Sequence, residues 1–198
     1  MTDKKVKSCL LCGVGGQGTV LASRIIASAA MEKGLRARTA ETIGMAQRGG
    51  NVVSHVRIGE EIHSPMIPKG SADILIGFEP GEAAANLSYL KEDGTLILCD
   101  QEVKPVTAAL GQSGYDGKTA VEYLRSKIDK CYIVDVKNII EECRTPKVLN
   151  VAVVGALCAS GEMDLTMEEV GRALEIKMKP KLVETNKKAL RMGAECIK

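Results

Sequence analysis

The chain has 198 residues, of which 45% are hydrophobic and 26% charged, and its net charge is +2. These values are ordinary for one globular domain, and a chain of this length buries about 70% of its unfolded surface without a metal or a disulfide. The small net charge, with one Phe, four Tyr and no Trp, argues against a nucleic-acid-binding surface, which needs basic patches and aromatic platforms for stacking bases.

The chain shows no feature of an exported or membrane protein. Its first eight residues are polar and lack an apolar signal region, and the longest apolar run, residues 148–159, is short and interrupted by Asn150. Its seven cysteines are an odd number, which argues against a disulfide framework. We therefore expect a cytoplasmic protein that does not associate with membranes.

Hydrophobic periodicity in the N-terminal half predicts strands that alternate with helices. The predicted strands cover residues 6–12, 35–41, 51–58 and 72–78, and the predicted helices cover residues 17–33 and 80–90. Gly59 and Glu60 are typical of the turn of a β-hairpin, whose second strand would cover residues 61–64.

The C-terminal half continues this alternation and then becomes helical. A turn at residues 92–94 precedes predicted strands over 95–99 and 131–136, and helices are predicted over 119–127, 147–160, 166–176 and 181–192. The helix over 147–160 is apolar on nearly every side, which predicts burial in the core or in an interface. We expect one α/β domain over residues 1–198, a Rossmann-like three-layer sandwich with a mostly parallel sheet, a β-hairpin excursion and a helical C-terminal tail over about 147–198.

A glycine-rich turn, GVGGQG, joins the first predicted strand to the first predicted helix. In this context the glycines allow a tight turn, close approach of a phosphate or carboxylate, and packing of the helix on the strand, while the helix N-terminus offers unpaired amides to an anion. The alternative is a crossover that needs glycine only for packing. The pattern predicts a cofactor or anion site formed by Gly13, Gly15, Gly16, Gln17 and Gly18.

A nicotinamide dinucleotide is an alternative ligand for this turn. The fingerprint for such ligands includes an acidic residue about 20 residues after the glycines, and Glu41 follows Gly18 by 23 residues. Arg36 and Arg38 precede Glu41, and no site for a hydride acceptor follows it. A stand-alone NAD(P)-dependent oxidoreductase and a nucleotide-binding regulator therefore remain the competing hypotheses.

A second polar segment, ETIGMAQRGGN, follows the second predicted strand. Its Arg48 is suited to bidentate recognition of a carboxylate or phosphate, and the next strand places His55 and Arg57 on one face. For His55 a satisfied or solvent-facing histidine is the alternative to a general base, and for Arg57 a solvated surface arginine stays open as the alternative. The residues that we expect to face substrate or a partner are Glu41, Gln47, Arg48, Gly49, Gly50, His55 and Arg57.

The cysteine pair Cys9 and Cys12 has CxxC spacing but lies within a predicted strand, where residues three apart point to opposite faces. No second CxxC completes a set of four thiolates. We therefore expect no metal site in this chain, and no residue can be given a catalytic step from the sequence.

Taken together, GVGGQG and ETIGMAQRGGNVVSHVRIG resemble the gamma-type subunits of the 2-oxoacid:ferredoxin oxidoreductases. The resemblance is closest to the beta subunits of the indolepyruvate branch, which residues 44–46, Gly-Met-Ala, also favour. It continues through residues 64–67, 72–79 and 94–97 and loosely into the C-terminal helices, so it covers most of the chain.

The resemblance implies an accessory subunit that is inactive alone and binds no cofactor tightly. In that family a large partner subunit holds thiamine diphosphate and the iron–sulfur clusters, an aryl pyruvate is oxidatively decarboxylated, electrons pass to ferredoxin, and the acyl group leaves as a coenzyme A thioester. This chain would contact the large subunit directly and ferredoxin indirectly, on the substrate or coenzyme A side of a shared site. A homodimer of the isolated chain, the identity of the 2-oxoacid and direct contact with coenzyme A stay open.

Overall fold

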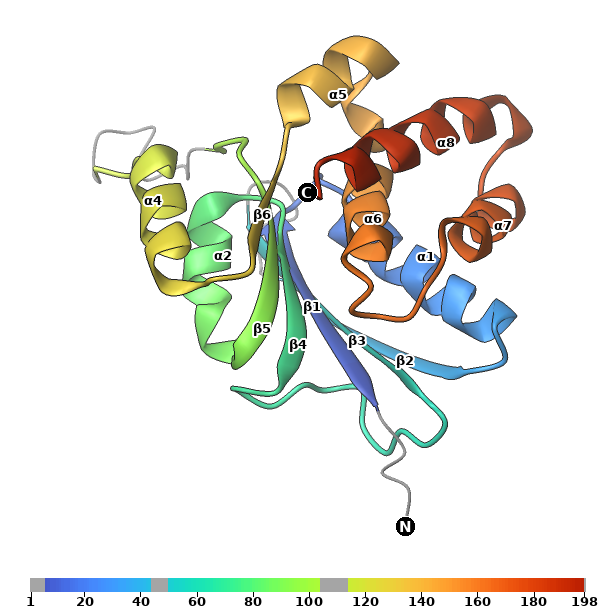
Figure 1. Cartoon of the computed structure of the whole chain (residues 1–198), viewed down its shortest axis with the longest axis horizontal. Coiled ribbons are helices and arrows are strands. Elements are labelled where there is room, and N and C mark those ends of the chain that lie inside the picture. Colours follow the sequence, from blue (N-terminus) through green and yellow to red (C-terminus); the bar gives the residue numbers. More distant parts are fainter. Residues whose placement is uncertain (1–5, 44–49, 104–113, 198) are drawn as a thin grey trace.

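The computed structural model of the chain describes residues 6–43, 50–103 and 114–197. A six-stranded sheet forms its middle layer, in the order β2-β3-β1-β4-β5-β6 (Figure 1). Strands β1, β4, β5 and β6 are parallel, whereas β3 runs antiparallel to both β1 and β2. The predicted α/β fold with a mostly parallel sheet is confirmed. The strands are β1 (Lys7–Val14), β2 (Arg36–Ile43), β3 (Asn51–Gly59), β4 (Ala72–Gly77), β5 (Leu90–Cys99) and β6 (Cys131–Val134).

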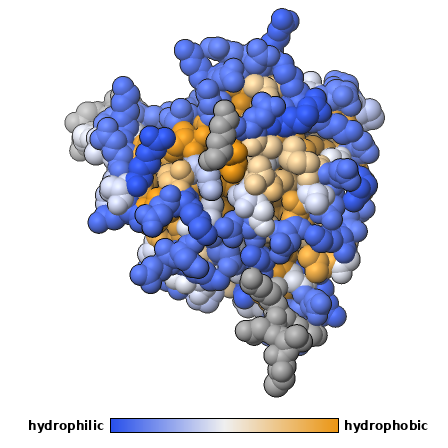
Figure 2. Space-filling model, in the orientation of Figure 1, coloured by the Kyte–Doolittle hydropathy of each residue, from blue (hydrophilic) through white to orange (hydrophobic). Residues whose placement is uncertain are grey.

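Helices cover both faces of the sheet, and each face has its own apolar core. One face carries α1 (Thr19–Glu32), α6 (Leu149–Ser160), α7 (Met167–Lys177) and α8 (Pro180–Glu195). The other carries α2 (Pro80–Asn86), η1 (Leu87–Tyr89) and α4 (Gly117–Lys127), while α5 (Val136–Cys143) and η2 (Pro146–Val148) link β6 to α6. Hydrophilic side chains surround the apolar groups that reach the surface in Figure 2. None of the helices in the described ranges is long and apolar enough to cross a membrane.

The hairpin lies at a different place from the one predicted. Strands β2 and β3 pair with each other, and residues 61–64 form a loop instead of a strand. The reason is that β3 already pairs with β1 on one edge and β2 on the other, so no free edge remains for a further strand. Ile62 in this loop is nevertheless buried.

Two further boundaries differ from the prediction. The expected turn at residues 92–94 is a bulge inside β5, where the pairing with β4 shifts between Leu90 and Thr95. The expected strand over 131–136 ends at Val134, because Asp135 accepts a hydrogen bond from the backbone N–H of Asn138 at 3.0 Å and thereby caps α5.

The helical C-terminal segment is one layer of the sandwich. Helix α6 is buried from Leu149 to Leu157, so the expectation of a core helix is confirmed. It crosses α8 at very close range: a Cβ on Gly155 would lie 1.9 Å from the Leu190 carbonyl oxygen, and one on Gly193 would lie 1.8 Å from that of Ala152. Backbone therefore touches backbone at this crossing, and only glycine fits on each helix.

These contacts predict a position-specific cost for a single methyl group. Gly155→Ala and Gly193→Ala should each lower the free energy of unfolding by about 3 kcal/mol, because the helices must separate to admit the Cβ. Gly171→Ala on the neighbouring helix α7 is the matched control: open space surrounds its Cβ position, so it should be neutral or raise stability by about 1 kcal/mol. Urea unfolding of the three variants measures the difference, and an equal effect at all three glycines would contradict this packing.

Candidate functional site

The glycine-rich turn follows β1 and leads into α1. Gly16 and Gly18 have φ angles of +105° and +89°, which favour glycine. Gly13 is required for a different reason, since a Cβ there would lie 2.7 Å from the Cβ of Phe78 at the end of β4. Two of the glycines thus shape the turn, and one lets it pack closely against the neighbouring strand.

Gln17 holds this turn against β4. Its Oε1 accepts a hydrogen bond from the backbone N–H of Val14 at 2.7 Å, and its Nε2 donates to the carbonyl oxygen of Phe78 at 2.9 Å. The side chain therefore faces inward and fastens the turn. The contribution expected of Gln17 was a backbone donor, but its backbone N–H already donates to the carbonyl oxygen of Val14 at 3.1 Å, so Gln17 shapes the turn and offers no free amide to a ligand.

The gap between the carboxyl ends of β1 and β4 is where α/β sheets commonly bind ligands, because the helices after these strands cover opposite faces. Here protein groups fill that gap. Beside the Gln17 bridge, the backbone N–H of Phe78 donates to the carbonyl oxygen of Cys12 at 2.8 Å. The carboxylate of Glu79, 3% exposed, accepts from the backbone N–H of Glu82 at 2.9 Å and from the hydroxyl of Tyr115. These groups close the gap between the two strand ends.

The outer side of the turn borders an open hollow of about 590 Å³. Helix α1 has no side-chain cap, and the backbone N–H groups of Gly16, Gly18 and Thr19 have no acceptor among the described residues. The exposed Arg24 lies on the same flank of α1. Unpaired amides and a cation at the positive end of a helix suit an anionic ligand. The hollow is lined by Gly15, Gly16, Gly18, Thr19, Val20, Leu21, Arg24 and Val52.

Arg24 was not among the predicted site residues. The sequence did contain a signal for Arg24. It lies in the helix predicted directly after the glycine-rich turn, on the same helix face as Val20 and Leu21 one turn earlier, so its charge is near the turn. Val52 could not have been found in this way, since only the pairing of β3 with β1 brings it beside the turn.

The second motif meets the first at one point. The carbonyl oxygen of Gly50 accepts a hydrogen bond from the backbone N–H of Gly15 at 2.8 Å. Gly50 therefore lies at the glycine-rich turn, as a shared site requires. Gln47, Arg48 and Gly49, together with residues 44–46, lie outside the described residues.

Glu41 does not occupy the position that a dinucleotide needs. It lies on β2, where it pairs with Ser54 of β3, and Ser54 in turn pairs with Leu11 of β1. The inserted antiparallel strand places β2 two strand spacings, about 10 Å, from β1. In a dinucleotide-binding fold the acidic residue ends the strand directly beside β1, so this geometry does not support the NAD(P) alternative.

His55 is buried in the core, 2% exposed, and does not face a ligand or a partner. Its Nδ1 accepts a hydrogen bond from the backbone N–H of Ile67 at 3.2 Å, and its ring meets that of Tyr89 edge-on with centroids 5.8 Å apart. Burial lowers the pKa of His55, since the charged imidazolium loses solvation. Of the alternatives that the sequence left open for His55, the structure shows the satisfied histidine.

Arg57 lies toward the other end of the sheet, where β3 pairs it with Ser8 near the start of β1. Its Nη1 donates to the carbonyl oxygen of Ser64 at 3.0 Å and so holds the loop after β3. Arg57 is therefore about 17 Å along the strand from the level of Gly13, too far to share a small ligand with the turn.

The cysteines behave as small apolar groups. Cys9 and Cys12 belong to the cores on opposite faces of the sheet, as their spacing predicted, and burial raises the pKa of both thiols. Within the part of the chain that the structure describes, no three His, Cys, Asp or Glu side chains come together as metal ligands. The residues present do not fit an iron–sulfur cluster.

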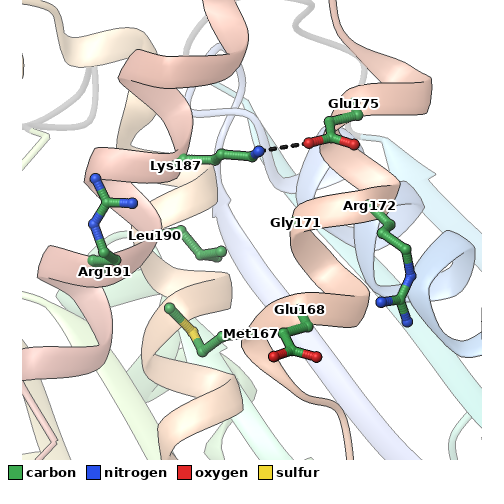
Figure 3. A pocket seen from close by; sticks show the side chains of 8 residues that line it. All are labelled: Met167, Glu168, Gly171, Arg172, Glu175, Lys187, Leu190 and Arg191. Carbon is green, nitrogen blue, oxygen red and sulfur yellow. Dashed lines mark hydrogen bonds and ion pairs between the residues drawn. The ribbon is translucent and has the colours of Figure 1, made fainter.

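A second hollow, of about 370 Å³, lies between α7 and α8 (Figure 3). Met167 and Leu190 line it with apolar groups, and Lys187 pairs with Glu175 across it at 2.5 Å. An exposed ion pair of this kind contributes little to stability. The hollow contains no residue of either sequence motif.

Comparison with known proteins extends the likeness to nearly the whole chain. Residues 8–196 match the family described as pyruvate ferredoxin/flavodoxin oxidoreductase. A protein named indolepyruvate oxidoreductase subunit IorB, from Archaeoglobus fulgidus, is 40% identical over 185 residues, which are 93% of this chain and 92% of that protein. A protein of the same name from Pyrococcus horikoshii is 30% identical over 196 residues, 98% of this chain and 97% of its own length.

The fold is also that of a solved relative. The crystal structure of pyruvate oxidoreductase subunit PORC from Thermotoga maritima matches with a TM-score of 0.72 and 25% identity over 97% of each chain. The similarity in fold therefore extends over the sheet and the helical C-terminal layer.

The buried His55 predicts a pH dependence of stability. Because its folded pKa lies below the unfolded value near 6.5, the contribution of neutral His55 is complete above that pH and is lost as the pH falls toward the folded pKa. Urea unfolding at pH 7.5 and 5.5 should show a smaller loss of stability for His55→Asn, which keeps an acceptor near Nδ1, than for the unmodified chain. His63→Asn, at the exposed second histidine, should behave like the unmodified chain, and a pH response unaltered in His55→Asn would refute this explanation.

The inward position of Gln17 predicts a structural effect. Gln17→Met keeps the length of the side chain but leaves the Val14 N–H and the Phe78 carbonyl without partners. It should lower the free energy of unfolding by about 1–3 kcal/mol. Gln101→Met, at an exposed position, is the control and should leave stability unchanged. If both variants unfold at the same urea concentration, the bridge has no structural importance.

Proposed function

The chain belongs to the pyruvate ferredoxin/flavodoxin oxidoreductase family, and from this membership we propose that it is the gamma-type subunit of an indolepyruvate:ferredoxin oxidoreductase. The proposal that the substrate is indolepyruvate rests on the 40% identity to a relative named indolepyruvate oxidoreductase subunit IorB, over 92% of the length of that relative. A relative from Pyrococcus horikoshii with the same name supports it over 97% of its length.

The redox chemistry in this proposal belongs to a larger partner subunit. That partner holds thiamine diphosphate and iron–sulfur clusters, and these supply the decarboxylation and the electron transfer to ferredoxin. The described part of this chain offers no cluster of metal-ligating side chains, and its inserted strand β3 separates Glu41 from the glycine-rich turn. Its own contribution is therefore binding and positioning, and coenzyme A is the co-substrate that accepts the acyl group.

The outer side of the glycine-rich turn is the binding surface in this proposal. The amides of Gly16 and Gly18 and the side chain of Arg24 offer donors and positive charge to an anionic group of coenzyme A or of the 2-oxoacid. Gly50 ties this surface to the segment with Gln47, Arg48 and Gly49, which we propose faces the same ligand or the partner.

The test is reconstitution of the complex. The chain co-expressed with a thiamine- and cluster-bearing large subunit should co-purify with it and reduce a viologen dye when indole-3-pyruvate and coenzyme A are added. Pyruvate and 2-oxoisovalerate, tested in parallel, should be turned over at least tenfold more slowly. Each subunit alone should be inactive.

Two results would contradict the proposal. One is a large subunit that reduces the dye equally well without this chain. The other is an NAD(P)H-linked turnover by the purified chain alone that Glu41→Ala abolishes, which would restore the dehydrogenase alternative.

A further inference from the structure

Asn150 is a polar residue in a helix that is otherwise apolar at its buried end. It lies in the first turn of α6, every other residue from Leu149 to Leu157 is apolar, and Asn150 itself is only 5% exposed. Its Oδ1 accepts a hydrogen bond from the backbone N–H of Val151 at 2.9 Å. Its amide NH₂ group donates to none of the residues that the structure describes.

The NH₂ group of Asn150 is open to a partner outside the chain. Its Nδ2 is not among the fully buried side-chain nitrogen and oxygen atoms that lack a hydrogen-bond partner, so it reaches the molecular surface although the residue as a whole is only 5% exposed. Because Nδ2 has no acceptor among the described residues, it is free to donate to a group that binds at this point.

The NH₂ group of Asn150 lies against the glycine-rich turn. A Cβ built on Gly18 would be 2.9 Å from Nδ2 of Asn150, so the side chain occupies the space directly beside Gly18. Gly18 is the last residue before α1, whose first turn has no side-chain cap. The amide of Asn150 and the backbone N–H groups that open α1 therefore lie close together at the positive end of α1.

We propose that Asn150 is a ligand-binding residue whose NH₂ group, together with the backbone N–H groups of Gly18 and Thr19, binds an oxyanion of a phosphate or carboxylate at the N-terminus of α1. An oxyanion is the class of group that accepts from several converging N–H donors and is favoured by the helix dipole. The inference deepens the proposed function and rests on it only for which co-substrate carries the anion.

The experiment titrates the free full-length chain with two probes in separate calorimetric runs. Inorganic pyrophosphate represents a phosphate source, and indole-3-acetate represents the carboxylate of an aryl acid. At least one probe should bind saturably, and Asn150→Leu should weaken that binding about tenfold while the variant still unfolds cooperatively in urea. Asn150→Asp, which keeps the shape but loses both donors, should weaken it at least as much.

Asn186→Leu is the matched control, because Asn186 is also 5% exposed and lies in a helix, α8, away from the turn, where its Nδ2 already donates to the Leu182 carbonyl oxygen. It should leave the affinity unchanged. Unaltered affinity in Asn150→Leu, equal weakening in Asn186→Leu, or no binding of either probe to the unmodified chain would overturn the inference. Failure of the reconstituted complex to turn over indole-3-pyruvate would contradict the proposed function and leave this titration result standing.

Discussion

The arrangement of the site depends on the bridge that Gln17 makes between the end of β1 and the end of β4. By satisfying the Val14 N–H and the Phe78 carbonyl oxygen, one side chain fastens the glycine-rich turn across the centre of the sheet. The crevice that a parallel sheet normally offers to a ligand is thereby filled. The amides of the turn that lack an acceptor border the hollow beside α1, which is the binding surface in our proposal.

The helical C-terminal segment is part of the same arrangement. Helix α6 packs on α8 through Gly155 and Gly193 with backbone contacts on both sides, and this layer shares its core with α1. The close packing holds the first turn of α6, and with it Asn150, against Gly18. A segment that reads as an appendage in the sequence thus supports the turn and supplies a polar group beside it.

Much of the fold follows from local patterns. Apolar runs predicted β1 and β4, helical spacing predicted α1, and the apolar composition of residues 147–160 predicted a core helix. The predicted secondary structure was wrong at short segments whose local sequence favours one structure but whose pairing with neighbouring strands imposes another. Gly59 and Glu60 are typical of a hairpin turn, yet β3 has no free edge to pair with residues 61–64. Residues 92–94 form a bulge because β4 continues to pair on both sides of them.

The sequence by itself determined the fold class, the glycine-rich turn and the family, because each depends on residue types at short, regular spacings. Only the tertiary structure decided which motif residues belong together. In the folded chain the Gln17 side chain faces inward, and His55 is buried against residues 67 and 89. Arg57 lies toward the other end of the sheet. Gly50, Arg24 and Asn150 lie beside the glycine-rich turn. The physical reason is that strand order and helix packing join residues distant in the chain, and no local pattern records the insertion of an antiparallel strand between β1 and β2.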